Sequence, residues 1–586
     1  MKPNRKPYAL LLAGAFLLAQ AGCKDLLDLK PQDRIEDADF WQTPNDFMLA
    51  ANNLYTFERS FVQVVIDNVP NSNTSLAPTQ NYHADHKGDL VAAQNVYSRG
   101  LNTILPTDPN YNTAYTRIRT INYLLDKAQT YARPDDIKQY AAEARFFRAY
   151  VYFDLLQTYG GVPIVDKLLA PDSPDLQAPR NTRDEVVDFI IRDLEAALPD
   201  VPAKAAQPST ELGRINKETV QAFLGRVTLY EGTWQKFRGN SGRATPLLDK
   251  SIVASGTVVS GRQYSLFAPA VLGDSAQKYL FILENQRSNP ASVSKSVNNE
   301  YILANRYDQA ARQVRSFVSR PAQQLSLTRT FANLYLCQDG LPVDKSPLFR
   351  GYATLTSEFV NRDNRMRYNM KKPRNTYWYS GGNARVNWTG DAADRAAGQP
   401  FVVSTTPSGY GNQKWVAERA FPDNEEGYDY PVIRLAEVLL NYAEALYERN
   451  GNISNADLDL TVNLVRQRVN RTMPKLSNAF VGANGLDMRT EIRRERTIEL
   501  YLEGFRVDDL KRWNAAVVEL RKPLTGIKWV GTQFQTEWPA QSATPKDAEG
   551  NIVVDGSRSF SEKNYLIPLP SQQLQLNPQL QQNPGW

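Results

Sequence analysis

Apolar residues recur every three or four positions over several long stretches of the chain, which predicts amphipathic helices. The clearest stretch covers residues 430–451, where one face carries Val432, Leu435, Leu439, Tyr442 and Leu446. A second apolar stripe at about residues 456–470 predicts a partner helix. Together they would form a helical hairpin of about the length of one tetratricopeptide repeat. The pattern therefore predicts a packing unit here rather than a reaction centre.

Further helices are predicted over residues 111–131, 135–159, 182–198, 217–234 and 487–514. Between residues 237 and 429 the helical period weakens, and Gly, Ser, Asn and aromatic residues dominate. Two short stretches there, 279–283 and 401–404, are candidate strands. The predicted fold class is mainly α, with a degenerate tetratricopeptide-like scaffold over about residues 40–236 and 430–520. The loop-rich part, about 237–429, is where we expect ligand specificity.

The N-terminus has the pattern of an export signal. Lys2, Arg5 and Lys6 precede an apolar run at residues 9–19 that is too short to span a bilayer stably, and small residues lead into Cys23. This predicts a lipoprotein signal peptide over residues 1–22, with lipidation of Cys23 at the start of a single mature domain, residues 23–586. Cys337 would then have no disulfide partner, and we expect it to be a small buried residue.

Composition narrows the class of protein. With 42% hydrophobic and 22% charged residues, the chain is expected to be globular. The net charge of +5 includes the three basic residues of the signal, so the mature chain is too near neutral to predict nucleic-acid binding. Only two histidines occur, and the motifs of zinc peptidases, P-loop proteins and serine hydrolases are missing. We expect no enzyme, although a converging pair of carboxylates is not detectable by motif.

An aromatic cluster at residues 375–388 is the first candidate for ligand contact. Its rings, Tyr377, Trp378, Tyr379 and Trp388, lie among Gly, Asn and Arg. Sugars have apolar faces edged by hydroxyls, so aromatic rings beside amide and guanidinium donors suit them. The alternative is that these rings pack a small core of their own.

The segment 81–89 contains both histidines, His83 and His86, with Asp85 and Asp89 beside them. A solvated loop is one interpretation and a divalent-metal site is another, although the spacing lacks a third ligand, so no metal or other cofactor is assigned. Secondary ligand candidates are Trp234, Tyr410 and Trp415, whereas Trp513 is interpreted as structural. The alternating charges of residues 493–496 favour ion pairs at a helix surface.

Four stretches together resemble the SusD/RagB family of outer-membrane nutrient-binding lipoproteins of Bacteroidetes. They are CKDLLDLKPQ from Cys23, IRLAEVLLNYAEA with VNLVRQRVN, IRRERTIELYLEGFRVDDLKRW at residues 492–513, and the ending YLIPLP…NPQLQQNPGW. The resemblance implies a helical fold with four tetratricopeptide-like hairpins and an irregular ligand-binding part. It also implies a protein that covers a SusC-like TonB-dependent barrel and hands it oligosaccharides or, in some members, peptides.

By the same resemblance, the early loop borders the ligand pocket in starch-binding members, which makes Asn81, His83 and Asp85 candidates for sugar contact. The main hypothesis is therefore a lipid-anchored protein of the outer membrane, facing the exterior, that captures oligosaccharide and delivers it to a SusC-like transporter. One alternative keeps this partner but makes the cargo a peptide. Another is a helical scaffold with no role in transport.

Overall fold

The computed structural model describes residues 40–64, 83–284, 288–308, 310–312, 314, 318–372, 376–379, 382–385, 406–418 and 426–586. The predicted signal peptide and Cys23 lie outside these residues. The described chain is mainly helical, which confirms the predicted fold class. None of its helices combines the length and the apolarity needed to cross a membrane.

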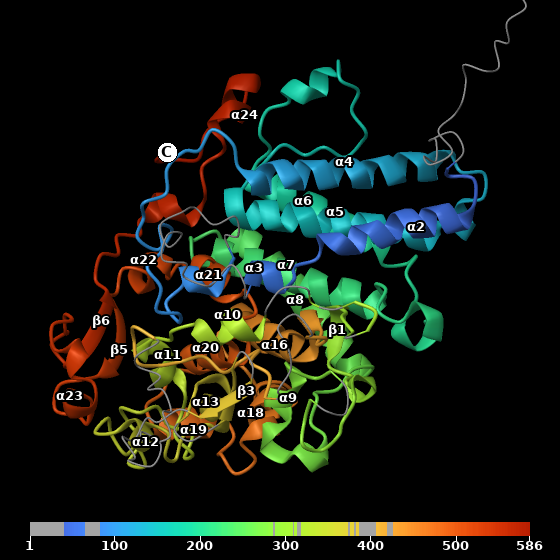
Figure 1. Cartoon of the computed structure of the whole chain (residues 1–586). Coiled ribbons are helices and arrows are strands. Elements are labelled where there is room, and N and C mark those ends of the chain that lie inside the picture. Colours follow the sequence, from blue (N-terminus) through green and yellow to red (C-terminus); the bar gives the residue numbers. More distant parts are fainter. Residues whose placement is uncertain are drawn as a thin grey trace, which may run out of the picture.

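The N-terminal helices lie side by side at one end of the molecule (Figure 1). They are α2 (Pro44–Leu54), α4 (Pro109–Thr130), α5 (Lys138–Tyr159) and α6 (Arg183–Ala197). Local sequence explains their ends: Thr43 with Asp46, and Thr182 with Glu185, form capping boxes. Gly160 takes the positive φ of 80° that ends α5. Their apolar faces belong to one continuous buried cluster that extends into the C-terminal half.

A long helix was missed in the segment expected to be loop-rich. After α7 (Lys217–Lys236), α8 (Ser241–Gly261) packs along it as an antiparallel partner. Its Pro246 and several Gly, Ser and Thr residues weaken helix propensity, which hid it from sequence reasoning. Tertiary packing compensates, because Gly225 lies so close to Ser255 that an added Cβ would come within 2.3 Å of the serine hydroxyl.

The stretch at 430–451 is a strand followed by a helix. Tyr430–Arg434 forms β4, which pairs antiparallel with β1 (Tyr301–Asn305), and α16 follows at Leu435–Asn450. Pro431 therefore lies in a strand rather than in the first turn of a helix. The predicted partner helix is divided into α17 (Asn455–Leu460) and α18 (Val462–Val469), because Thr461 leaves the helical conformation. The hairpin itself is present and consistent with a tetratricopeptide-like unit.

The irregular part consists of short elements, most of them in the lower half of Figure 1. They are α3 (Phe61–Val64), α9 (Ala276–Leu280), α10 (Ser319–Gln324), α11 (Arg329–Leu334), α12 (Leu355–Glu358), α13 (Asn364–Asn369), β2 (Thr376–Tyr379) and β3 (Gly382–Arg385). The strand predicted at 279–283 is wrong, because the segment starts inside α9; a short buried apolar run has no period that separates helix from strand. The candidate strand at 401–404 lies outside the described residues.

The C-terminal part continues the helical scaffold and adds a small sheet. Its elements are α19 (Asn478–Ala483), α20 (Met488–Glu499), α21 (Arg506–Arg512), α22 (Ala516–Glu519), β5 (Leu524–Lys528), α23 (Phe534–Glu537), β6 (Asn551–Asp555) and α24 (Ser571–Leu576). The single helix predicted over 487–514 is therefore two helices. Between them Leu502 and Gly504 adopt positive φ angles of 56° and 78°, which no helix continues through.

A buried network of ion pairs surrounds the end of α20. The Glu499 carboxylate accepts hydrogen bonds from Arg434 at 2.8 Å and from Arg468, and it lies 3.3 Å from Arg365. Arg434 also binds Glu300 and Glu503. Burial alone would raise the pKa of Glu499, but the three guanidinium groups hold it well below its usual range. We call this set the Glu499 network.

The ion pairs expected at a helix surface are therefore largely interior. Glu495 and Arg496 are about as buried as Glu499. Arg496 binds Asp509, and Arg512 binds both Asp509 and Glu444. The Trp513 indole donates to the same Glu444 at 2.6 Å, which confirms its structural interpretation. Cys337 is also buried, as expected.

Replacing Glu499→Gln is expected to destabilise the fold by about 3 kcal/mol or more, because it leaves buried guanidinium groups without their counter-charge. Denaturant unfolding of the purified chain measures this. Glu195→Gln is the matched control, since Glu195 pairs with Lys250 where both side chains are well exposed. The control should cost less than about 1 kcal/mol. Equal losses in the two variants would contradict a central role for the Glu499 network.

Candidate functional site

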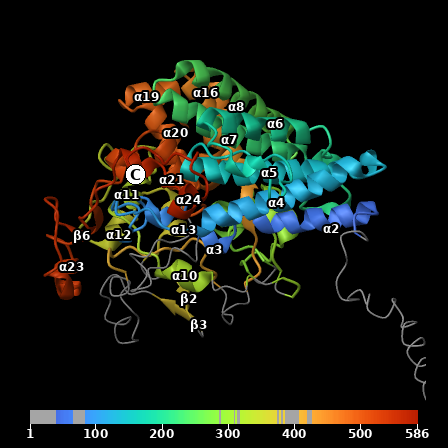
Figure 2. The same cartoon turned by 90° about the horizontal axis from the view of Figure 1, so that it is seen from above.

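Three of the four candidate aromatic residues lie on one strand of a hairpin. Tyr377, Trp378 and Tyr379 belong to β2, which pairs antiparallel with β3 so that Trp378 faces Asn383 in register and Thr376 faces Arg385. The hairpin lies beside α10, at the opposite edge of the molecule from α8 and α16 (Figure 2). Trp388 and Asn81 lie outside the described residues. Ligand contact by this cluster stays a prediction.

The hairpin starts from a base built of backbone pairing between distant segments. Met370 bridges Asn412, Ser326 bridges Gly411, and Val91 bridges Leu327, all antiparallel. Lys371 N donates to Gly411 O at 2.8 Å, and Ala92 N donates to Ser326 O at 2.7 Å. We call these four paired segments, near residues 91, 326, 370 and 411, the bridged ribbon. Because residues 370 and 411 are paired, the chain that carries the hairpin leaves and re-enters at one point.

The bridged ribbon also holds the second predicted site segment. Residues 83–90 lead directly into it, and Thr328 holds them in place. The Thr328 hydroxyl donates to Asp89 O at 2.7 Å. The backbone N–H of Thr328 donates to Leu90 O. The structure thus connects two candidate regions that lie almost three hundred residues apart in sequence to one base. Loops held on such a base suit binding, because their position is fixed before a ligand arrives.

His83 and Asp85, however, point into the protein. His83 is 6% exposed, and its Nδ1 lies 2.6 Å from Asp508 Oδ2 on α21. Burial lowers the pKa of His83, so the neutral ring is favoured and donates from Nδ1. Burial would raise the pKa of Asp508, but His83 and nearby cations lower it to about 2. The interpretation as a solvated loop is wrong.

Arg506 explains why this segment folds inward. Its guanidinium makes two bonds of 2.7 Å to Asp89, and its backbone N–H donates to Asp85 Oδ1 at 3.3 Å. Asp85 Oδ2 has no hydrogen-bond partner in the described chain, and burial raises the pKa of Asp85 to about 7. This gives His83 and Asp85 a structural role. Their contact with sugar stays a prediction that the burial does not support.

The metal alternative gains no geometric support in the part of the chain that the structure describes. No group of three or more His, Cys, Asp or Glu side chains converges there in a way that would hold an ion.

The secondary aromatic candidates are core residues. Trp415 is fully buried, and its indole donates to Leu502 O at 3.0 Å within a cluster that includes Phe61 and Phe281. Tyr410 is also fully buried and donates to Glu358. Trp234 is enclosed by the stacked guanidinium groups of Arg183 and Arg238, at 3.9 and 3.5 Å. These three residues are therefore withdrawn as ligand contacts.

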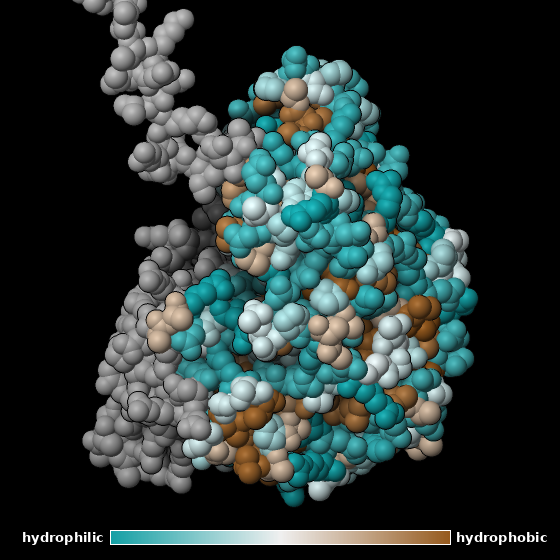
Figure 3. Space-filling view, turned by 90° about the vertical axis from the view of Figure 1, so that its right-hand side faces the viewer, coloured by the Kyte–Doolittle hydropathy of each residue, from teal (hydrophilic) through white to brown (hydrophobic). Residues whose placement is uncertain are grey.

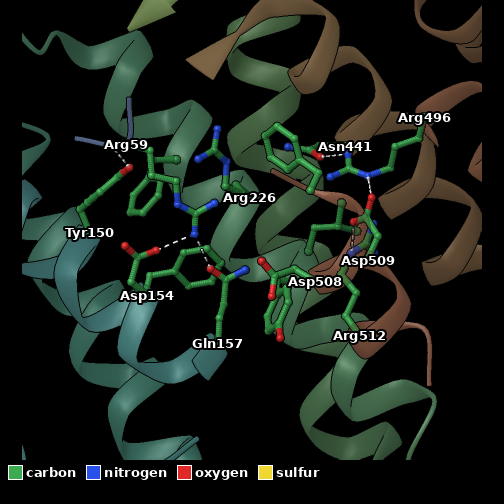
Figure 4. Close-up of a pocket in the computed structure, with 15 residues that line it drawn as sticks. Arg59, Tyr150, Asp154, Gln157, Arg226, Asn441, Arg496, Asp508, Asp509 and Arg512 are labelled. Carbon is green, nitrogen blue, oxygen red and sulfur yellow. Dashed lines mark hydrogen bonds and ion pairs between the residues drawn. The ribbon is translucent and has the colours of Figure 1, made fainter. Parts of the chain in front are cut away.

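A charged cavity lies where α5 and α7 meet α21 (Figure 4). Arg59 enters it and binds Asp154 at 2.6 Å and Gln157 at 3.3 Å, opposite Asp508. Its volume of about 20 Å³ has room for about one water molecule and excludes a sugar ring. The cavity therefore belongs to the packing between the scaffold and the C-terminal motif.

No pattern in the sequence indicates the bridged ribbon. Each contact in it joins one or two residues of distant segments, so no segment is long enough to show a two-residue period. Only the positions of its partners in the folded chain reveal it.

Comparison with known families agrees with this architecture. A family model described as the SusD family matches residues 285–586, which is more than half of the chain. A second, described as starch-binding and associating with the outer membrane, matches residues 39–229. The chain belongs to the SusD family. The two matches together include the bridged ribbon, the hairpin and the helical scaffold except α8 and the last turns of α7, which lie between them.

Individual relatives are more distant. SusD-like proteins P38 and P2 of Formosa agariphila are 26% and 27% identical over 216 and 236 residues, which is 36% and 38% of this chain. The matched parts span only 39% and 43% of those two relatives. A solved SusD-like carbohydrate-binding protein of Bacteroides fragilis superposes with a TM-score of 0.68 at 22% identity, covering 92% of this chain and all of that one. A laminarin-binding SusD-like protein gives 0.53 at 19%, covering 92% and 99%. The two structures show a shared fold.

Asp85→Asn should change how stability depends on pH. Because the folded-state pKa of Asp85 is raised to about 7, its protonated form favours folding, and that contribution is lost as pH rises from about 4 to 7. Relative to that of the wild type, the free energy of unfolding of the variant should rise by on the order of 3 kcal/mol between pH 5 and pH 8. Urea unfolding at both pH values measures this. Asp172→Asn, at an exposed position, is the control. If the free energy of unfolding changed with pH in the same way for the wild type and both variants, Asp85 would not be held protonated in the folded chain.

Proposed function

We propose that this chain is a cell-surface glycan-binding lipoprotein that captures oligosaccharide and delivers it to a SusC-like, TonB-dependent transporter of the outer membrane. One observation carries the proposal: in a SusD-family chain, three consecutive aromatic residues of β2 lie on a hairpin that starts from the bridged ribbon.

The composition of the hairpin suits sugars. β3 pairs Asn383 with Trp378 and Arg385 with Thr376, so one residue with an amide donor and one with a guanidinium donor lie on the strand beside Trp378; Tyr377 and Tyr379 pair with Ala384 and Gly382. Aromatic rings offer apolar area to the faces of a sugar, and polar groups fix its hydroxyls. Capture of this kind needs no catalytic group, so we assign no enzymatic activity and no cofactor.

The printed descriptions of relatives support the same cargo. One matching family model is described as starch-binding, and similar solved structures are named as carbohydrate-binding and laminarin-binding proteins. Those descriptions apply to those proteins, and they favour a glycan over a peptide for this one.

Anchoring and delivery complete the proposal. The export signal with Cys23 would attach the chain to the outer membrane by lipid, facing the exterior, and the family description also names association with that membrane. The TonB-dependent partner follows from the family resemblance.

Trp378→Ala should weaken glycan binding by roughly tenfold or more, because a stacking ring is lost. Calorimetric titration of residues 24–586 against a panel of polysaccharides and peptides measures this. Trp586→Ala is the matched control, since this tryptophan lies at the C-terminus, away from the hairpin in Figures 1 and 2.

Three outcomes would contradict the proposal. If the protein bound peptides but no glycan, its cargo would be a peptide. An equal loss in both variants would remove the hairpin as the platform. No binding of any glycan or peptide would favour a scaffold without a transport role.

A further inference from the structure

A second cavity, of about 280 Å³, lies within the N-terminal helical scaffold. It opens between the last turns of α4, the first half of α5, and the connections that follow α5 and α6. Its lining residues are Leu125, Ala128, Gln129, Pro134, Ile137, Lys138, Ala141, Arg145, Arg148, Asp166 and Asp200. We call it the α4–α5 pocket. Its lining residues belong to the end of the helical layer where α4 stops, whereas β3 lies in the lower part of Figure 1.

The floor of the α4–α5 pocket is aliphatic. Leu125, Ile137 and Ala141 are buried there, and Ala128 is half-buried beside them. The lining contains no aromatic ring. It therefore lacks the flat surface on which a sugar face stacks, and it favours an aliphatic group instead.

One guanidinium of the pocket is fixed and another is available. Arg148 is 7% exposed and makes two bonds to Asp193, of 2.7 and 2.8 Å, so its charge is already compensated. Arg145, one turn earlier on α5, is half-buried and makes no hydrogen bond, ion pair or ring contact with any residue that the structure describes. A guanidinium in this position can bind a carboxylate with two hydrogen bonds.

The pocket also carries the opposite charge. The carboxylates of Asp166 and Asp200 likewise form no hydrogen bond or ion pair within the described chain, although the backbone oxygen of Asp166 accepts from Arg148. Unengaged charges of both signs around an apolar floor match a ligand that itself carries both signs. The face of the molecule drawn in Figure 3 is mainly hydrophilic, with separate apolar patches. Asp166 is exposed and Asp200 and Arg145 are half-buried, so the charged rim is reached from water.

We propose that the α4–α5 pocket binds a zwitterionic ligand with an aliphatic side chain, of one or two amino-acid residues. The ligand's carboxylate pairs with Arg145, its ammonium group pairs with Asp166 or Asp200, and its side chain covers Leu125, Ile137 and Ala141. The volume, slightly below the usual range for drug-sized ligands, sets the size limit. This site is separate from the glycan platform and does not depend on it.

The experiment titrates the full chain with L-leucyl-L-leucine by calorimetry and compares four further probes. L-leucine tests size, glycylglycine lacks the apolar group, N-acetyl-leucine lacks the ammonium, and leucinamide lacks the carboxylate. We expect leucyl-leucine or leucine to bind, and each of the three deficient probes to bind about tenfold more weakly or worse. Undetectable binding of both L-leucyl-L-leucine and L-leucine would overturn the proposal. Equal binding of N-acetyl-leucine would reduce the site to an anion pocket, which also overturns it.

Variants locate the site. Arg145→Gln should weaken leucyl-leucine at least tenfold while leaving glycan binding unchanged. Arg192→Gln, at an exposed position of α6, is the matched control and should bind as the wild type does. Ala128→Leu fills the pocket from a half-buried position, so it tests occupancy without removing a charge. Wild-type affinity in both Arg145→Gln and Ala128→Leu would place the ligand elsewhere and contradict the assignment.

Discussion

The structure depends first on the charge balance around Glu499. The Glu499 carboxylate accepts hydrogen bonds from arginines of three segments: Arg434 at the end of β4, Arg468 on α18 and Arg365 on α13. Charges removed from water in this way are costly unless every partner is in place. The network can therefore form only when α20, the helical hairpin of α16 to α18 and the irregular part meet in one arrangement. It sets the relative positions of scaffold and insertion more specifically than apolar contact does.

The same C-terminal motif extends this constraint to the candidate site. In the turn between α20 and α21, Glu503 binds Lys414 and Leu502 O accepts from Trp415, which lie just beyond the bridged ribbon. Arg506 then holds Asp89 on the other side. The segments around residues 89 and 414, which lie next to the bridged ribbon, are thus held by neighbouring residues of one motif. The β2–β3 hairpin therefore extends from the bridged ribbon, whose position the buried charges determine.

Sequence reasoning recovered the helices that apolar periodicity encodes. The helices α4 to α7 and α16 follow from their three- and four-residue apolar repeats. It missed α8, whose Pro246 and small residues oppose a helix locally, because its stability comes from close packing on α7. It also placed the ion pairs of residues 493–496 at a helix surface. Local pattern does not show that Glu495 meets arginines more than a hundred residues away as well as near ones.

The site candidates show why residue type alone is a weak guide to binding. Histidine, aspartate, tryptophan and tyrosine were chosen for their chemistry, yet His83, Asp85, Trp415 and Tyr410 are all buried. Tyr410 lies in the bridged ribbon itself, whereas Tyr377, Trp378 and Tyr379 lie on the hairpin that starts from it. Arg145 was not a candidate at all, since an arginine on a helix has no distinguishing pattern. Its significance comes from having no partner in the described chain while Arg148, a turn away, has several. For binding, the decisive property is which charges the fold leaves uncompensated, and that property belongs to the folded chain.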